Sequence, residues 1–156
     1  MTMRIDVSEI GLERSVRAFH GYGARTRNLY PVMQYIAEDF ERIMEDQFAS
    51  EGASTGTEWA PLSDDWWEHK VNVGKDHGTL QYNQKLVESL TSDGAEGSIR
   101  RVTNNEVTMG TSIDYAIFHV EGTGRMPRRN FMRLPANSQR HWIAVLNRYV
   151  LTGRMY

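Results

Sequence analysis

The sequence predicts a single α+β domain over residues 1–156, in which a small antiparallel sheet packs against a long amphipathic helix and a C-terminal helix. Three observations support this fold class. Apolar residues recur every three or four positions in residues 29–48, alternate with polar ones in residues 98–109, and return to helical spacing after residue 138. The chain is long enough for one domain, and this order of elements is typical of the α+β class.

The N-terminal residues predict a short strand followed by a helix. Residues 4–7 alternate polar and apolar side chains, as a half-buried strand does. Ser8 has the side chain of an N-cap residue, and apolar residues follow it at roughly helical spacing. We expect this helix to end at Gly21 and Gly23, because glycine is unfavourable inside a helix.

Residues 29–48 show the strongest helical pattern in the chain. Asn28 is expected to cap the helix, Pro31 lies in its first turn, and Gly52 lies just past its end. One face is apolar and is expected to form the centre of the core. The outer face is acidic and carries Glu38, Glu41, Glu45 and Asp46.

Residues 51–78 are expected to form a long loop that carries Trp59, Trp66 and Trp67. Glycine, serine and proline interrupt any periodic pattern there. Within this loop, Ser63 followed by Asp64 is typical of the start of a short helix, because side-chain oxygens accept the free backbone N–H groups of the first turn. Residues 80–91 then predict another helix.

A two-residue period from residue 98 predicts a β-hairpin. Asn104 and Asn105 separate its strands, and asparagine tolerates the positive φ of tight hairpin turns. Residues 114–120 are more apolar and predict a third, more buried strand. Residues 124–135 form an extended Arg-rich segment, and Asn137 or Ser138 is expected to cap a final helix.

The charged residues divide the chain into an acidic and a basic part. Residues 1–98 contain 9 Lys/Arg and 17 Asp/Glu, a net charge of −8, whereas residues 99–156 contain 9 and 3, a net charge of +6. Residues 124–156 contain seven arginines and no acid. Such asymmetry indicates interaction surfaces, unless the two parts neutralise each other within the fold; both alternatives remain open here.

Residues with catalytic or metal-binding chemistry form no recognised pattern. The absence of Cys excludes disulfides, thiolate metal sites and thiol nucleophiles. No His pair has the spacing of a metal-binding helix, and no serine lies in a G-x-S-x-G turn. We therefore expect no enzyme activity, no cofactor and no functional metal, and we rank a metal-dependent hydrolase last. The best metal candidates, which an acidic first helical turn explains as well, are Asp64, Asp65, Glu68, His69 and Asp76.

Arginine and tryptophan are residue types that anchor protein interfaces. The candidate contact residues, besides the acids of residues 38–46, are Arg125, Arg128, Arg129, Arg133, Trp59, Trp66 and Trp67. In an alternative interpretation the arginines form a nucleic-acid-binding module, in which they contact phosphates while Phe131 stacks on a base. A net charge of −2 argues against the broad basic face that such binding normally uses.

Several short motifs occur in an order that resembles the phage virion morphogenesis family. A G-x-x-W-x-P-L-S loop followed by Lys is matched by Gly56, Trp59, Pro61, Leu62, Ser63 and Lys70. The L-x-x-S-L, V-x-x-G-T and Y-A-x-x-H/E-x-x-G motifs begin at Leu86, Val107 and Tyr115, and a P-x-R-x-F stretch begins at Pro127. The matches extend from about residue 28 to residue 150. Asn83 stands where the family has glycine, and its tolerance of positive φ is expected to compensate.

The resemblance implies a structural virion protein of tailed bacteriophages, without catalysis, that completes the tail and joins it to the head. It implies a six- or twelvefold ring at the neck or tail end, assembled in the cytoplasm of the host bacterium. Neighbouring neck, tail-terminator or tail-tube proteins are the implied partners, and genomic DNA is expected to pass through the lumen. No membrane contact is expected, because no apolar run is long enough to span one. A head-to-tail ring needs two complementary patches on each subunit, which the acidic helix and the Arg-rich segment can supply.

Overall fold

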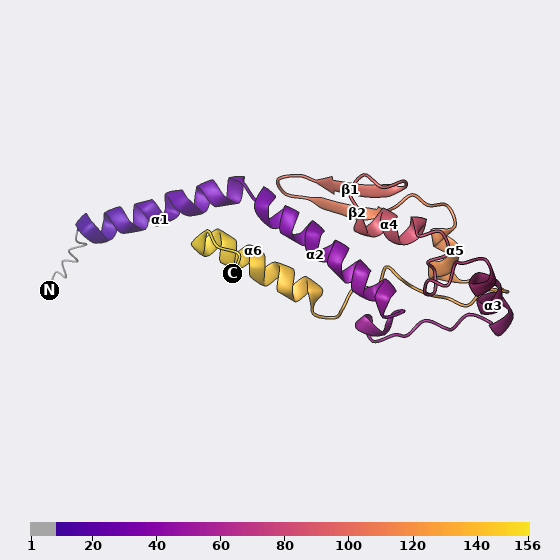
Figure 1. The fold of residues 1–156 in the computed structure, drawn as a ribbon. Coiled ribbons are helices and arrows are strands. Elements are labelled where there is room, and N and C mark those ends of the chain that lie inside the picture. The colour runs from indigo at the N-terminus through magenta and orange to yellow at the C-terminus, as the bar shows by residue number, and fades with distance from the viewer. Residues whose placement is uncertain (1–8) are drawn as a thin grey trace.

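The computed structural model describes residues 9–156, with side chains from residue 17 onward, so the strand predicted for residues 4–7 lies outside the described residues. The described chain is elongated, with α1 at one end and α3 at the other (Figure 1). The predicted α+β class is confirmed, since a two-stranded antiparallel sheet packs against helices. The elements are α1 (Glu9–Arg27), α2 (Tyr30–Ala49), the 3-10 helix η1 (Ala53–Thr55), α3 (Asp64–Asn72), α4 (Lys85–Thr91), β1 (Ser98–Val102), β2 (Val107–Thr111), α5 (Ala116–Glu121) and α6 (Ser138–Thr152).

Helix α2 forms the centre of the fold, as its apolar pattern predicts. Its buried face carries Phe40, Met44 and Phe48, each at most 7% exposed. The hairpin, α4 and α6 all pack against this helix (Figure 1). The buried face of α2 forms one core cluster with Trp59, Leu86, Leu90, Ala116 and Phe131.

The start of α2 differs from the prediction. Asn28 does not cap the helix; Leu29 occupies the N-cap position, and no side chain caps it. Pro31 in the first turn has no N–H group, which removes one of the donors that a cap would satisfy. The Asn28 carbonyl instead accepts a hydrogen bond from the Tyr149 hydroxyl at 3.1 Å. This residue therefore ties the connection between α1 and α2 to α6.

Helix α1 continues through Gly21 and Gly23, so the predicted end at these glycines is wrong. Each glycine destabilises a helix by roughly 1 kcal/mol relative to alanine. Contacts between the last part of α1 and α6 stabilise the helix in spite of them. Arg25 donates hydrogen bonds to the carbonyls of Val150 and Leu151 at 2.6 and 3.2 Å. Sequence periodicity cannot show such contacts, because they join residues far apart in the chain.

The loop after α2 turns back and places Trp59 in the core. Gly52 makes the turn with a φ of 93°, and the Trp59 N–H donates to the Glu51 carbonyl at 2.7 Å. The Trp59 ring meets Phe48 edge-on, with 5.4 Å between centroids. The predicted loop of residues 51–78 thus contains η1 and α3. Ser63 caps α3 as predicted, and its Oγ accepts a backbone N–H at 3.4 Å.

Replacing Gly52 by alanine is expected to destabilise the chain more than replacing Gly56. Both glycines have left-handed φ values, of 93° and 76°. A Cβ at Gly52 would lie 2.4 Å from the Thr57 carbonyl oxygen and 2.6 Å from the Trp59 ring, whereas nothing lies within 4 Å of one at Gly56. Chemical denaturation should show an extra loss of about 1–3 kcal/mol for Gly52→Ala, the usual cost of overpacking. Equal losses for the two variants would contradict this close packing.

Helix α4 is shorter than residues 80–91 predict. It begins only after Gln84, because Leu80 and Gln84 have left-handed φ values of 65° and 60°. The positive φ therefore falls on Gln84 and not on Asn83, so the expected role of Asn83 is wrong. The Thr79 N–H donates to the Glu51 carboxylate at 2.7 Å, which fixes this irregular segment against the loop after α2.

The predicted hairpin is confirmed, and β1 and β2 pair antiparallel along their whole length. Its connection does not use the positive φ expected of Asn104 and Asn105, so the predicted turn geometry is wrong. Thr103 closes the connection instead. Its N–H donates to the Glu106 carbonyl at 2.8 Å, and its hydroxyl accepts the Glu106 N–H at 3.1 Å.

Residues 114–120 do not form the predicted third strand, because they form a turn and the short helix α5. The N–H groups of Ala116 and Gly122 donate to the carbonyls of Ile113 and Phe118 at 3.0 and 2.9 Å. Ala116 faces the core, whereas Ile117 and Phe118 are about half exposed. A short apolar run fits a buried strand or a buried helical turn equally well, so its periodicity does not decide between them.

Helix α6 begins at Ser138 and packs along α2 and α1 (Figure 1). Asn137 occupies the N-cap position, as the sequence allows, but its side chain forms no capping hydrogen bond. The Trp142 indole N–H donates to the buried Asp39 carboxylate at 2.6 Å, and Val145 is 5% exposed. The opposite face of α6 contains no acid. Its exposed side chains include Arg140, Ile143, Arg148 and Leu151.

Candidate protein-interaction site

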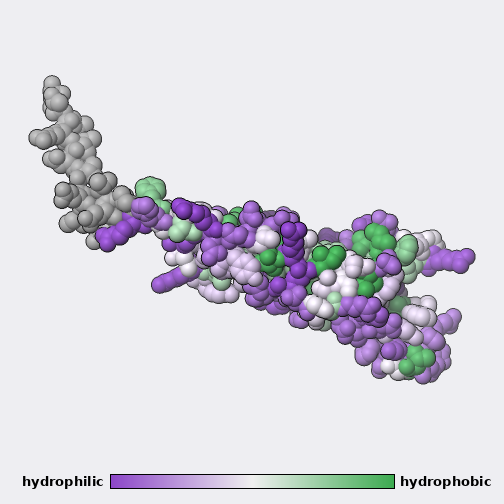
Figure 2. All heavy atoms as spheres, turned by 90° about the horizontal axis from the view of Figure 1, so that it is seen from above, coloured by the Kyte–Doolittle hydropathy of each residue, from purple (hydrophilic) through white to green (hydrophobic). Residues whose placement is uncertain are grey.

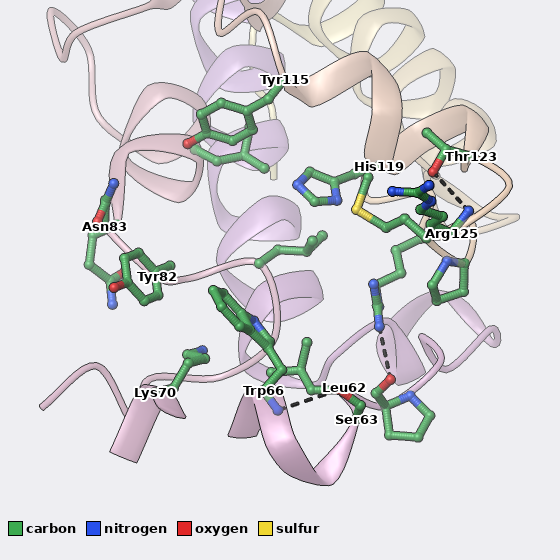
Figure 3. A pocket seen from close by; sticks show the side chains of 17 residues that line it. Leu62, Ser63, Trp66, Lys70, Tyr82, Asn83, Tyr115, His119, Thr123 and Arg125 are labelled. Carbon is green, nitrogen blue, oxygen red and sulfur yellow. Dashed lines mark hydrogen bonds between the residues drawn. The ribbon is translucent and has the colours of Figure 1, made fainter. Parts of the chain in front are cut away.

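A pocket of about 950 Å³ lies between α3, α5 and the segments that precede α4 and follow α5. Figure 3 shows Trp66 and Tyr82 on one side of it, with Tyr115, His119 and Arg125 on the other. These elements form the end of the molecule opposite α1, where Figure 2 also shows hydrophobic residues at the surface. The pocket is therefore the best candidate for a binding site at this end.

Four of the five motifs that resemble a virion protein family contribute residues to this pocket, and the V-x-x-G-T motif on β2 does not. Each motif is short, and they are separated by up to tens of residues along the chain. The fold brings four of them around one cavity that is open to solvent. Residues that served only to pack the core would not need to line such a cavity. Lining residues from these motifs include Leu62, Lys70, Leu86, Tyr115, His119 and Arg129.

Arg129 joins the Arg-rich segment to the loop after α2. Its side chain is 4% exposed, with Nε donating to the Ala60 carbonyl at 2.7 Å and Nη2 to the Pro61 carbonyl at 2.9 Å. Its backbone N–H donates to the His119 carbonyl at 2.7 Å. Burial lowers the pKa of the guanidinium, and the Glu51 carboxylate acts in the opposite direction. The side chain predicted to contact a partner thus holds the pocket wall within its own chain.

Lys70 is a second buried cation at the pocket and is 1% exposed. Its Nζ donates to the carbonyls of His77 and Gly78, the latter at 2.9 Å. Burial lowers the pKa of this ammonium group below its ordinary value. The two hydrogen bonds fasten α3 to the segment that follows it, so Lys70 fixes the position of the helix that carries Trp66.

Trp66 and Trp67 both lie at the surface, about 45% exposed. Trp66 stacks with His69 at 5.0 Å and with Tyr82 at 5.8 Å between ring centroids, and it lines the pocket. Trp67 does not line it, because adjacent residues on a helix point in different directions. The two rings therefore present separate apolar contact surfaces.

His119 lies on α5, and its buried Nδ1 has no hydrogen-bond partner among the described residues. Burial, and next the positive charge of Arg129, lower its pKa below the usual 6.5. The folded chain therefore binds this proton less tightly than the unfolded chain does.

Acidification is expected to destabilise the chain through His119. Since the unfolded state binds the proton more tightly, stability falls as the pH decreases from about 6.5 towards the lowered pKa of the folded state. Thermal denaturation from about pH 8 to about pH 5 should show this loss, and His119→Gln should reduce it. His20→Gln, on the exposed part of α1, is the matched control and should leave the loss unchanged. An identical pH dependence in both variants would exclude His119 as its source.

Three of the four predicted contact arginines lie at the surface, namely Arg125, Arg128 and Arg133. Arg128 Nε donates to the Val120 carbonyl at 2.9 Å, and Arg133 Nη1 donates to the Thr57 hydroxyl at 2.5 Å. Within residues 17–156, no arginine of the segment after residue 124 forms an ion pair. The acids of the chain therefore do not neutralise the Arg-rich segment within these residues, although Arg100 of the basic part pairs with Glu41 and Asp93.

Two other predicted contact residues are used inside the chain. Trp59 lies in the core and is 6% exposed. Glu41 accepts a hydrogen bond from Arg100 Nε at 2.8 Å, and both side chains are largely buried. Like Arg129, these residues have intramolecular partners that come from distant segments. The predicted acids that remain exposed on α2 are Glu38, Glu45 and Asp46.

The structure corrects the nucleic-acid interpretation in one respect. Phe131 is 1% exposed and packs against Phe48 with 5.8 Å between ring centroids, so it cannot stack on a base. Four of the five metal candidates lie on α3. In the part of the chain that the structure describes, no group of three or more His, Asp or Glu side chains is placed to hold an ion.

Tyr115 and His119 belong to the Y-A-x-x-H/E-x-x-G motif, but the sequence analysis did not place them among the candidate contact residues. The predicted strand over residues 114–120 concealed them. Their four-residue spacing was the available signal, because it places both side chains on one face of a helix. In the structure their rings meet edge-on at 5.9 Å.

Comparison with known proteins gives a consistent assignment. A sequence model of the phage virion morphogenesis family matches residues 10–150. The "Mu-like prophage FluMu G protein 1" of Haemophilus influenzae is 28% identical over 124 residues, which cover 79% of this chain and 75% of that protein. No solved structure matches. Within the described residues, no helix combines the length and the apolar character that crossing a membrane requires.

Proposed function

We propose that this chain, which belongs to the phage virion morphogenesis family, is a non-catalytic subunit of a ring at the neck or tail end that completes the tail and joins it to the head. Its family makes it a phage virion morphogenesis protein. The ring, its six- or twelvefold symmetry and its place in the particle are the proposal. Its neighbours would be neck, tail-terminator or tail-tube proteins.

The observation that carries the proposal is that opposite charges remain unpaired on different elements of one chain. Helix α2 exposes Glu38, Glu45 and Asp46, and the Arg-rich segment exposes arginines that have no ion-pair partner in the described residues. A ring built head to tail uses a heterologous interface, in which two different patches meet. Charge complementarity would fix the order of the subunits and increase their rate of association.

The shape of the chain also supports assembly. Helix α1 extends from the body of the molecule, and its Phe19 is 72% exposed (Figure 1). Most helical stability in proteins comes from packing against other elements, so a helix that extends from the body gains stability from contact with a neighbour. Such an arm is suited to a subunit of a larger assembly.

The test of the proposed function is joining in vitro. Heads and tails from a phage mutant that lacks this chain are mixed with the purified protein and examined by electron microscopy. The expected result is complete particles that form only when the chain is added, with the chain at the junction. Heads and tails that join equally well without it would refute the role.

DNA binding by the exposed arginines is tested separately by a gel shift at low and high salt. Phosphate contacts predict strong, salt-dependent binding. If the joining of heads to tails requires the arginines but the chain shows no measurable DNA binding, the arginines contact protein.

A further inference from the structure

We infer that the pocket binds an extended segment of another virion protein, in which an aromatic or long aliphatic side chain lies next to an aspartate or glutamate. The nature of the partner rests on the proposed function. The binding chemistry rests on the pocket alone and is testable on the isolated chain. If the chain forms no ring, binding at the pocket can still be tested by itself.

Charge is the first observation. The pocket is lined by Lys70, Arg125 and Arg129, and by no aspartate or glutamate. Lys70 and Arg129 are buried, and neither forms an ion pair in residues 17–156. Buried charges in proteins are normally paired, and their field is strong in a partly dehydrated cavity. The Glu51 carboxylate acts electrostatically on both buried cations from outside the lining, and both donate to backbone carbonyls. Exposed Arg125 is therefore the lining cation that is available as the direct partner of a carboxylate on the occupant.

Apolar surface is the second observation. Trp66 and Tyr82 form a stacked wall, with 24° between their ring planes, and Tyr115 lies across the cavity (Figure 3). Leu62 and Met126 add aliphatic surface. Concave sites that combine such a lining with a few polar groups bind ligands that have an apolar anchor. An aromatic or long aliphatic side chain on the occupant fits this lining.

The surroundings of the pocket favour a peptide over a nucleic acid. Asp64 and Asp65 in the first turn of α3, and Asp114 before α5, are exposed next to lining residues. A phosphate backbone that continued beyond the pocket would meet these acids and be repelled. A peptide carries its single carboxylate into the cavity and can present neutral or basic residues outside it.

The described loops of the chain do not supply the occupant. Asp114 has an aromatic neighbour in Tyr115, but Tyr115 itself lines the pocket. Asp76 lies between Lys75 and His77, and Asp93 lies between a serine and a glycine. Glu58 has an aromatic neighbour in Trp59, but that side chain is in the core. A different protein is therefore the expected source of the occupant.

The test uses the peptide N-acetyl-Gly-Phe-Asp-Gly-amide, with nuclear magnetic resonance of the Trp66 indole N–H assigned through Trp66→Phe. A saturable shift is expected. The same peptide with Asn in place of Asp should bind about tenfold more weakly, since a charge-assisted hydrogen bond is lost. Arg125→Glu should weaken binding of the Asp peptide and strengthen binding of a Lys peptide. Arg101→Glu, on the exposed side of β1, is the control and should change neither.

Several results would overturn the inference. These are the absence of a saturable shift, equal binding of the Asp and Asn peptides, or tighter binding of a short oligothymidylate than of the Asp peptide. A Trp66 shift that depends on protein concentration without peptide would instead assign the pocket to a second copy of the chain.

Discussion

Replacing Phe131 by alanine is expected to lower the free energy of unfolding by about 3–5 kcal/mol, the usual range for a buried phenylalanine. Phe131 is 1% exposed and packs against Phe48 in the core. It also anchors the Arg-rich segment, since it lies two residues from Arg129 and two from Arg133. Loss of this ring would leave a cavity and release the segment that bears the exposed arginines.

Phe118→Ala is the matched control, because Phe118 is 53% exposed on α5. Its effect on the free energy of unfolding should stay within about 0.5 kcal/mol, as for most surface substitutions. Urea denaturation of both variants measures the two changes in the free energy of unfolding. Similar losses would contradict the placement of Phe131 in the core and Phe118 at the surface.

Reversing Arg128 and Arg133 to glutamate is expected to abolish the ring and the joining of heads to tails, with the domain still folded. Both side chains are exposed, so the change removes little packing. In the proposed interface the new glutamates would face the acids of α2, and like charges across an interface cost several kcal/mol. Native mass spectrometry measures the assembly, and circular dichroism measures the fold.

A second variant tests whether the effect arises from the proposed pairing. Adding Glu38→Arg and Glu45→Arg to the same chain exchanges the charges of both patches and should restore assembly. Arg101→Glu changes net charge on the hairpin and should leave assembly intact. If the exchanged chain stays monomeric while the control assembles, the arginines do not meet these acids.

The parts of the fold that the sequence predicts correctly are those with long periodic patterns. Residues 29–48 give an unbroken helical stripe, and residues 98–109 an alternation that allows one hairpin register. Errors fall where local signals are short or weak. The run over residues 114–120 is too short to separate a strand from a helix, and Gly21 and Gly23 are outweighed by contacts with α6.

The candidate site was less predictable, because it depends on contacts between distant segments. Glu41 and Arg100 are 59 residues apart, and Arg129 and Ala60 are 69 apart. Nothing in the local sequence distinguishes these buried side chains from exposed neighbours such as Glu45 or Arg128. The motif residues around the pocket could be recognised, but their meeting at one cavity could not.

Native mass spectrometry of the purified chain, followed by electron microscopy of the assembled species, tests the proposed assembly most directly. The predicted result is a closed ring whose mass is six or twelve times that of the 18.0 kDa chain, formed alone or with neck and tail partners, with α2 of each subunit facing the Arg-rich segment of the next. A chain that remains monomeric in the presence of those partners would contradict it.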